Sequence, residues 1–132
     1  WSVTSWAQLY RACQACDRWN MLHPLWCARV PYVAQCLGEK PGAVVAASDY
    51  LKALPDSIAK WLPAPLVSLG TDGFGRSDSR RKLRQFFEVD RHWVAYTALS
   101  ALVEQGKLKP KVLTDALKAF GIDPAKTNPL DC

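Results

Sequence analysis

The sequence has few of the features that mark membrane, secreted or metal-binding proteins. It contains no apolar run of the roughly 18 to 20 residues that a membrane-spanning helix needs. No basic segment followed by an apolar one opens the chain. The five cysteines are an odd number, which favours a reducing compartment over a disulfide framework. We therefore expect a cytoplasmic protein that spans no membrane.

The chain also lacks an initiator methionine, because it begins at Trp1 and its single methionine is Met21. We interpret it as a processed, trimmed or partial form of a longer protein. Its 132 residues suit one domain, and its share of 49% hydrophobic residues is ordinary for a globular protein. Six tryptophans require large apolar contact areas, which argues against a disordered chain.

Motifs of catalytic and metal sites are largely missing. No serine lies in a G-x-S-x-G turn, and the only two histidines are His23 and His92. We expect a hydrogen-bonded structural role for His23 and an exposed position for His92. Cys13-x-x-Cys16 has no second close cysteine pair, and helical spacing places both thiols on one apolar face. We therefore predict no metal site and no catalytic residue.

Apolar periodicity predicts alternating strands and helices in the first half of the chain. Residues 1–4 have the composition of the end of a strand, and 43–47 and 66–69 that of two further strands. Helices are expected at 6–18 after a Ser5 cap, at 32–37, at about 49–53 and at 55–61, with a turn at 38–42. Three strands are too few for a buried parallel sheet. We predict an α/β fold with a mostly parallel or mixed sheet, flanking helices, and a first strand and helix that precede Trp1.

From residue 77 onward the pattern is purely helical, so we predict a helical segment at 77–121 and a tail at 122–132. Three helices are expected there, at about 78–87, 91–105 and 111–120. The residues that cap or end them are Ser77, Asp90, Gly106, Pro110 and Gly121. We expect residues 1–132 to form a single, partial domain.

The most site-like feature is the loop Gly70–Gly75, which follows the third predicted strand and precedes a helix. Glycines let backbone N–H groups approach an anion, and the following helix N-terminus favours negative charge. The loop has neither the lysine of a Walker motif nor the dinucleotide-binding glycine spacing. The alternative is structural: Gly73 and Gly75 permit a tight connection, while Asp72 and Ser77 make turn and cap bonds. We expect alanine at Gly73 or Gly75 to lower stability even if the loop binds no ligand.

Positive charge is densest beside this loop. The net charge is +5, and Arg76, Arg80 and Arg84 recur every four residues, so they share a face if the helix begins early. Such a row can bind phosphates or carboxylates of a partner, or it can be a solvated face. Arg76 also suits an ion pair with Asp72 or Asp78. The candidate anion or partner site comprises Asp72, Gly73, Phe74, Gly75, Arg76, Ser77, Arg80 and Arg84.

Segments along nearly the whole chain together resemble one enzyme family. They are WSVTS at 1–5, RWNMLHP at 18–24, RVPYV at 29–33, VAASDY at 45–50, KALP at 52–55, LGTDGFGRSD at 69–78, FFEVD at 86–90, YTALSAL at 96–102 and GIDP at 121–124. This set resembles the C-terminal domain of the homodimeric bacterial pyruvate dehydrogenase decarboxylating component, a transketolase-like thiamine diphosphate enzyme. The combination is much more specific than any single motif.

The resemblance implies a transketolase-like C-terminal domain fold and a parent enzyme that converts pyruvate into carbon dioxide and an acetyl group. Thiamine diphosphate and magnesium are the implied cofactors of that parent, and the acetyl group passes to the lipoyl arm of an acetyltransferase. The implied partners are the remaining domains of the same subunit, the second subunit of a homodimer and the lipoyl acetyltransferase, with neither nucleic acid nor a membrane. Asp72–Gly75 lacks the Gly-Asp-Gly cofactor segment of such enzymes, so we expect the chain alone to bind no cofactor and to be inactive.

Two segments depart from the resemblance, and a second function stays open. Cys13–Cys16 and Leu25–Cys27 are apolar where polar or acidic residues are expected. The alternative function is a stand-alone module that binds an anionic regulator or an acidic protein partner through Gly70–Ser77 and its arginines. The tryptophans and an unpaired sheet edge also predict apolar surface that needs to be covered by protein.

Overall fold

The computed structural model describes residues 1–38 and 42–131. These residues form two compact units, one of Trp1–Gly42 with Ala53–Leu66 and one of Ala43–Lys52 with Val67–Cys132. The predicted turn at 38–42 lies mostly outside the described residues, as does the last residue of the predicted tail at 122–132. The single domain over 1–132 stays a prediction.

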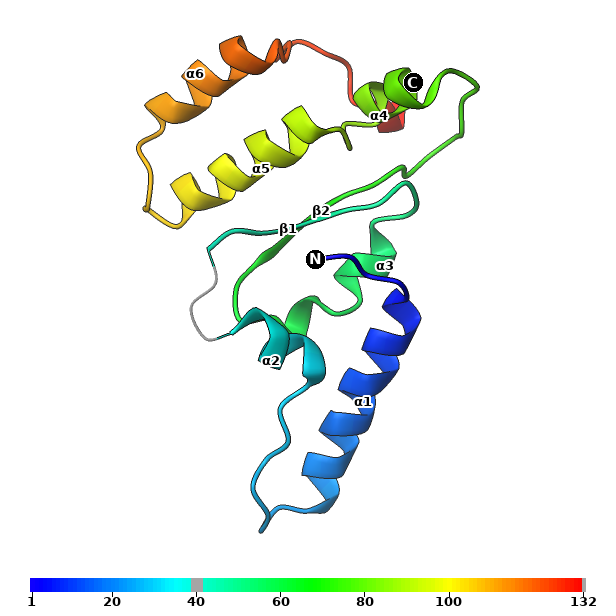
Figure 1. Ribbon diagram of the computed structural model, residues 1–132, viewed down its shortest axis with the longest axis vertical. Coiled ribbons are helices and arrows are strands. Elements are labelled where there is room, and N and C mark those ends of the chain that lie inside the picture. Colours follow the sequence, from blue (N-terminus) through cyan, green and yellow to red (C-terminus); the bar gives the residue numbers. More distant parts are fainter. Residues whose placement is uncertain (39–41, 132) are drawn as a thin grey trace. The chain divides into compact units, whose positions relative to one another are not determined.

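The first unit begins with the long helix α1 (Trp6–Leu22), drawn in blue in Figure 1. Ser5 caps it as predicted, because its Oγ accepts a hydrogen bond from Gln8 N at 3.3 Å. The helix continues beyond the predicted end at residue 18. Pro24 restricts only the residue before it, so His23, with φ −128° and ψ 61°, is the first residue to leave the helix.

Two short helices and a turn of 3-10 helix complete the first unit. Helix α2 (Tyr32–Leu37) follows Pro31 as predicted, and α3 (Ala53–Asp56) and η1 (Ala59–Trp61) follow later in the chain. Helix α1 contacts both α2 and α3. The centre of the core is Cys13, Val33 and Ile58, each at most 2% exposed. Partly buried apolar side chains pack around it: Trp6, Leu9, Tyr10, Leu37, Trp61 and Leu62.

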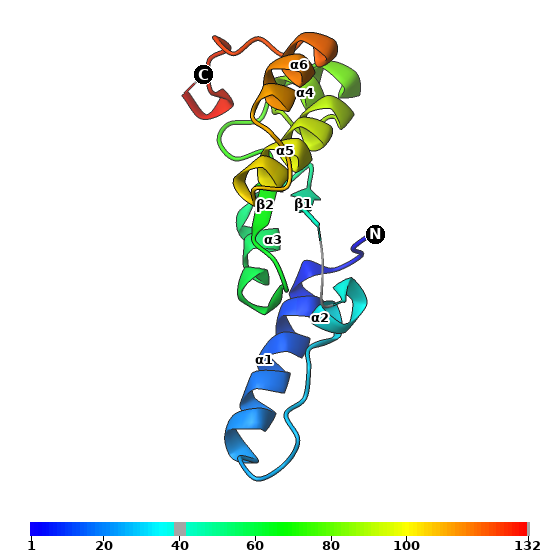
Figure 2. The same ribbon diagram turned by 90° about the vertical axis from the view of Figure 1, so that its left-hand side faces the viewer.

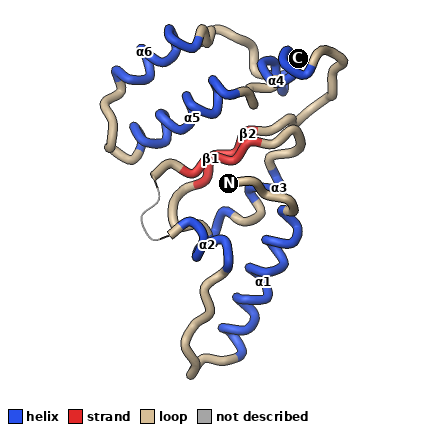
Figure 3. Tube along the Cα trace, viewed as in Figure 1, coloured by secondary structure: helices blue, strands red, loops and turns tan. Residues whose placement is uncertain are grey.

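The sheet consists of two parallel strands, β1 (Val44–Ala47) and β2 (Leu66–Leu69), shown in red in Figure 3. Both were predicted, and the α/β class is confirmed. The strand predicted at residues 1–4 is wrong, because that segment has no strand conformation. A strand needs a hydrogen-bonded neighbour, and among residues 1–38 and 42–131 the only pairing is between β1 and β2.

The helix predicted at 49–53 is also wrong, because the backbone after β1 pairs with the loop after β2 instead. Tyr50 O accepts a hydrogen bond from Thr71 N at 3.0 Å. Lys52 N donates to Asp72 Oδ1 at 2.9 Å, so this N–H cannot enter a helical ladder. Helix α3 therefore begins only at Ala53 and includes the residue that was expected to open a separate helix at 55.

Three helices follow the loop, as predicted in number and order. Helix α4 (Arg80–Phe86) begins later than the predicted start at about residue 78, because Ser79 still has extended backbone with φ −62° and ψ 146°. Helix α5 (Arg91–Glu104) is capped by Asp90, whose Oδ1 accepts from the backbone N–H groups of residues 92 and 93. Helix α6 (Lys111–Phe120) ends at Gly121, where φ is 65°, and the 3-10 turn η2 (Pro129–Asp131) lies near the end of the chain.

Helices α5 and α6 lie side by side in both Figure 1 and Figure 2, and α5 also contacts β1. Lys126 attaches the segment after α6 to the end of α4, since its Nζ donates to Phe86 O at 2.7 Å and to Glu88 Oε1 at 2.9 Å. None of the helices in the described part of the chain is long and apolar enough to cross a membrane.

Candidate functional site

Gly70, the residue directly after β2, lies where two backbone segments approach most closely. It is buried, and a Cβ built on it would lie 2.6 Å from Tyr50 O and 2.8 Å from Lys52 Cγ. Only glycine fits between the loop and the segment after β1. Sequence reasoning assigned the steric demand to Gly73 and Gly75 and missed Gly70, because a close approach of two segments leaves no local pattern.

The other two glycines of the loop differ from each other. Gly73 has a φ of 92°, a conformation that side-chain-bearing residues rarely adopt, so its predicted conformational role is confirmed. Gly75 has no positive φ, and nothing lies within 4 Å of a Cβ built there. The prediction that Gly75 holds a strained shape is therefore wrong.

Asp72 joins the ends of the two strands. Its Oδ1 accepts from Lys52 N at 2.9 Å, and its Oδ2 lies 3.8 Å from Lys52 Nζ. The neighbouring Thr71 Oγ1 donates to Asp49 O at 3.0 Å. The carboxylate of Asp72 is thus engaged by the backbone and side chain of its own fold, as the structural alternative for the loop expected.

Arg76 lies in the loop and not on α4, because that helix begins only at residue 80. Its guanidinium lies over the ring of Phe86, with 4.1 Å from Cζ to the ring centroid. Within the described residues it forms no ion pair with Asp72 or Asp78, so the predicted ion pair is wrong. The expected row of three arginines on one helical face is reduced to Arg80 and Arg84.

The remaining loop residues are open to solvent. Phe74 is 91% exposed, and Ser77 is also exposed. The predicted Ser77 cap is wrong, since it is Asp78 Oδ1 that accepts from Ser79 N, at 2.6 Å, just before α4. Asp78 Oδ1 also lies 4.0 Å from Lys82 Nζ, one helical turn onward.

Arg84 is held by a carboxylate that the sequence analysis did not select. Its Nε donates to Asp49 Oδ1 at 3.2 Å and its Nη2 to Asp49 Oδ2 at 2.9 Å. These hydrogen bonds and the charge of Asp49 raise the pKa of Arg84 further above its already high range. A usable signal was present: Asp49 follows β1 as Asp72 follows β2, and the carboxyl ends of parallel strands meet at one edge.

A pocket of about 410 Å³ opens beside this ion pair, and we call it the loop pocket. Of the predicted site it brings together Gly75, Arg76, Arg80 and Arg84, whereas the other four predicted residues do not line it. Its arginines face two carboxylates, so the charges are mixed. The lining residues are Asp49, Thr71, Gly75, Arg76, Asp78, Arg80, Leu83, Arg84, Phe87 and Val89.

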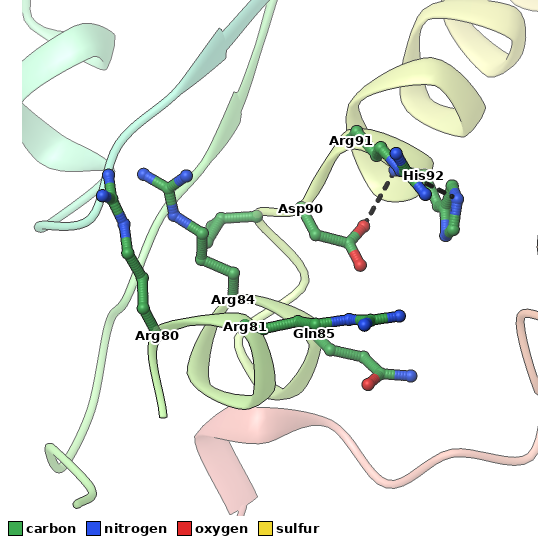
Figure 4. A pocket seen from close by; sticks show the side chains of 8 residues that line it. Arg80, Arg81, Arg84, Gln85, Asp90, Arg91 and His92 are labelled. Atoms are coloured by element: carbon green, nitrogen blue, oxygen red, sulfur yellow. Dashed lines mark hydrogen bonds between the residues drawn. The ribbon is translucent and has the colours of Figure 1, made fainter. Parts of the chain in front are cut away.

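A second pocket, of about 760 Å³, lies between α4 and the start of α5, and we call it the arginine pocket. Figure 4 shows Arg80 and Arg84 running alongside each other from α4, while Arg81 extends toward the side on which Asp90 and Arg91 lie. The lining residues are Arg80, Arg81, Arg84, Gln85, Val89, Asp90, Arg91 and His92. Arg81, Arg91 and His92 are not among the candidate site residues predicted from the sequence; Arg81 belongs to the dense basic run but was expected to lie on a solvated face.

The two histidines have structural contacts. His23 Nδ1 lies 2.8 Å from Trp19 O, and its ring stacks on Trp19 at 4.4 Å, which confirms the expected structural role. His92 was expected to be exposed, but it is half-buried, and its ring stacks on Phe120 at 5.6 Å. Arg91 Nε donates to His92 Nε2 at 3.3 Å.

The cysteines and carboxylates do not form a metal centre in the part of the chain that the structure describes. Cys13 is 1% exposed, and burial raises the pKa of its thiol, which disfavours the thiolate that binds metal. Cys16 Sγ donates to Arg29 O at 3.0 Å. No group of three or more His, Cys, Asp or Glu side chains among the described residues is placed to hold an ion.

Comparison with known proteins gives one family. The profile of the family described as "Transketolase-like TK C-terminal domain" matches residues 1–90. The chain is 53% identical over 133 aligned positions to the "Pyruvate dehydrogenase E1 component" of Pseudomonas aeruginosa, which covers 100% of the chain and 15% of that relative. It is 48% identical to the protein of the same name from Escherichia coli K12 and 43% identical to that from Cupriavidus necator, with 98% of the chain and 14% of each relative covered. The chain thus spans about 15% of the length of the curated relatives it matches.

Proposed function

The chain belongs to the transketolase-like C-terminal domain family, and on that premise we propose that it is this domain of a pyruvate dehydrogenase E1 component. The observation that carries the proposal is the 53% identity to one such component, which extends over the whole chain. The proposed parent reaction converts pyruvate into carbon dioxide and an acetyl group for a lipoyl arm. Thiamine diphosphate and magnesium are the cofactors proposed for the parent protein.

Within that protein the chain has a structural and partner-facing role and not a catalytic one. The hydrogen bonds of the polar groups in and near the loop support this non-catalytic role. Asp72 is hydrogen-bonded to the backbone of Lys52, and Asp49 holds Arg84, so neither carboxylate is left for a cofactor or for proton transfer. His23 is bonded to a backbone carbonyl. These contacts stabilise the fold around the loop and leave the chemistry to other parts of the enzyme.

Exposed apolar side chains support a role in packing against further protein. Leu25 is 97% exposed, Met21 71% and Trp26 70%, all in one stretch of the first unit. Single exposed apolar residues are ordinary, but several that lie close together in the sequence favour an interface. The proposed partners are the remaining domains of the subunit, a second subunit of a homodimer and a lipoyl acetyltransferase. The proposed compartment is the cytoplasm.

A direct activity comparison tests this function. The natural full-length protein, supplied with pyruvate, thiamine diphosphate and magnesium, should release carbon dioxide, whereas the isolated chain of residues 1–132 should release none above the blank. Calorimetry of the isolated chain should show no heat of thiamine diphosphate binding. Micromolar binding of the cofactor to the isolated chain would contradict the non-catalytic role, and an inactive natural protein would contradict the proposed enzyme.

A second candidate function is binding of an acidic protein partner or anionic regulator at the loop pocket. The observation in its favour is that Arg76, Arg80 and Arg84 line this pocket. The ion pair with Asp49 already occupies Arg84, so Arg80 is the arginine that such a partner would meet. Rim charges of this kind act mainly on the association rate, which falls as salt is added.

Charge reversal at Arg80 tests the second candidate. Arg80→Glu in the natural protein should slow association with the lipoyl acetyltransferase at low salt, and the difference from wild type should shrink at high salt. Lys109→Glu, an exposed position between α5 and α6, is the matched control and should leave the rate unchanged. Identical rates for wild type and Arg80→Glu at both ionic strengths would eliminate docking at this pocket.

A further inference from the structure

The arginine pocket concentrates positive charge that the fold does not neutralise. Four arginines line it, Arg80, Arg81 and Arg84 from α4 and Arg91 from the first turn of α5. Among the residues that the structure describes, one carboxylate lines it, that of Asp90. Like charges held in one place repel each other, so this arrangement costs stability unless something opposes the repulsion. The pocket therefore differs from a solvated helix face, on which both signs of charge alternate.

The ion pairs of the fold separate the four arginines into two kinds. Arg84 is satisfied by the bidentate contact with Asp49. No carboxylate among residues 1–38 and 42–131 lies within ion-pairing distance of Arg80, Arg81 or Arg91. These three guanidinium groups are also exposed, so a ligand can reach them.

Asp90 offsets only one of these three positive charges, and it forms no ion pair with Arg80, Arg81 or Arg91 within the described residues. Its Oδ1 accepts from His92 N at 2.9 Å and from Trp93 N at 3.0 Å, which fixes the carboxylate at the start of α5. Figure 4 shows that first bond as a dashed line and Arg91 beside it. Arg91 Nε donates to the ring nitrogen Nε2 of His92 at 3.3 Å, a contact with a group that carries no negative charge.

We propose that the arginine pocket binds a small ligand that carries a phosphate or diphosphate group, held by Arg80, Arg81 and Arg91. Three unpaired guanidinium groups beside one carboxylate leave an excess of two positive charges. That excess matches a phosphate group, which carries about −1.5 to −2 at neutral pH. Phosphate oxygens also match the paired N–H donors of guanidinium groups, which bind them in a bidentate manner.

The volume of the arginine pocket and the side chains of its wall fit a ligand that is larger than a single ion. The volume of about 760 Å³ falls within the range of pockets that bind small molecules. His92 lies in the pocket wall with its ring stacked on Phe120, and Val89 adds an apolar side chain, so the wall can hold the uncharged part of the ligand. This inference goes beyond carbon dioxide release and protein docking, and it differs from the anionic regulator of the second candidate because Arg81 and Arg91 do not line the loop pocket.

The test uses inorganic pyrophosphate as the probe and the natural full-length protein as the receptor. The protein is first saturated with thiamine diphosphate and magnesium, so that any cofactor site of the proposed enzyme is already filled. Binding is measured by calorimetry, and its place is measured by hydrogen exchange in peptides that cover residues 80–92. Arg81→Ala/Arg91→Ala is the test variant, and Arg11→Ala/Arg18→Ala, which removes two exposed arginines of α1, is the matched control.

We expect pyrophosphate to slow hydrogen exchange in residues 80–92 of the wild type and of the control. The affinity of the Arg81→Ala/Arg91→Ala variant should fall about tenfold or more, because charge-assisted hydrogen bonds are lost. The proposal is overturned if pyrophosphate gives no heat of binding with the wild type, or if the test variant binds it with equal affinity. It is also overturned if pyrophosphate slows hydrogen exchange elsewhere in the chain and not in residues 80–92. Binding of an acidic peptide at residues 80–92 without binding of pyrophosphate overturns it too. Carbon dioxide release, measured on the same samples, reports separately on the proposed enzyme.

Discussion

The loop pocket and the arginine pocket share Arg80 and Arg84 but differ in how far carboxylates neutralise their arginines. In the loop pocket Arg84 forms a bidentate pair with Asp49, and the other carboxylate, Asp78, bonds the backbone before α4 and faces Lys82. In the arginine pocket the single carboxylate is occupied by a helix cap, and three arginines have no partner of opposite charge in the described part of the chain.

A dense run of basic residues in a sequence therefore does not identify a binding site by itself. Residues 80–84 contain four basic side chains in five positions. Whether such a side chain stabilises the fold or stays free to bind a ligand depends on whether another segment places a carboxylate next to it. Arg84 forms an ion pair with Asp49, which follows β1, and so stabilises the fold. Arg81 lines a pocket with other arginines and with Asp90, the carboxylate that caps α5. The first kind of arginine should affect stability, and the second should affect binding.

The largest effect on the loop side is expected from Gly70→Ala. The new Cβ would lie 2.6 Å from Tyr50 O, a backbone atom that also accepts the hydrogen bond of Thr71 N and therefore cannot easily move. Overpacking of this kind typically lowers the free energy of unfolding by up to about 3 kcal/mol. Urea unfolding followed by circular dichroism measures it. A Gly70→Ala protein as stable as wild type would show that the loop and the segment after β1 are not held together as described.

A smaller loss is expected from Gly73→Ala, with Gly75→Ala as its matched control. Gly73 has a φ of 92°, and forcing a side chain into the left-handed region costs about 1 kcal/mol or more. Gly75 has open space around it and no positive φ, so its substitution should stay within about 0.5 kcal/mol of wild type. Equal losses at both positions in the same unfolding assay would refute the distinction.

Removing the carboxylate that holds Arg84 should cause a still smaller, salt-sensitive loss. Asp49→Asn breaks the ion pair, whose side chains are 40% and 59% exposed, so solvent already screens most of the attraction. The midpoint of denaturation should fall at low salt and return toward the wild-type value at high salt. Asp115→Asn, an exposed position on α6, serves as control and should not move the midpoint. A salt-independent loss at Asp49 would point to a cause other than the ion pair.

The smallest effect on stability, and one of opposite sign, is expected from Arg81→Ala. This substitution removes a cation from a pocket that is lined by three other arginines and by one carboxylate, that of Asp90. The relief of repulsion should leave the free energy of unfolding unchanged or slightly higher, within about 0.5 kcal/mol. A clear loss of stability would show that Arg81 is a structural residue. The two pockets would then not differ in whether their arginines stabilise the fold.

Local pattern was enough to predict the helices that have clear caps. Ser5, Asp90 and Gly121 each act where the sequence placed them, since a cap depends on residues within one turn. Strands β1 and β2 were equally readable as short apolar runs. The family resemblance was carried by segments spread over the whole chain, and it agrees with the family match at residues 1–90.

Contacts between segments distant in sequence could not be predicted. The pairing of Asp49 with Arg84 joins residues 35 positions apart, and the bond between Asp72 and Lys52 spans 20 positions. These contacts explain why no helix forms at 49–53. Helix α4 begins only at Arg80, so Arg76 lies in the loop before it and contacts the ring of Phe86 in place of extending the expected helical row.

The most direct test of the contrast is a pair of double-mutant cycles, measured by chemical unfolding at low salt in the natural protein. One cycle combines Asp49→Asn with Arg84→Ala, and the other combines Arg81→Ala with Arg91→Ala. We predict a stabilising coupling between Asp49 and Arg84 and a coupling of the opposite sign, or none, between Arg81 and Arg91. A stabilising coupling between Arg81 and Arg91 as large as that of the ion pair would contradict the account, because it would mean that the arginine pocket is already neutralised within the fold.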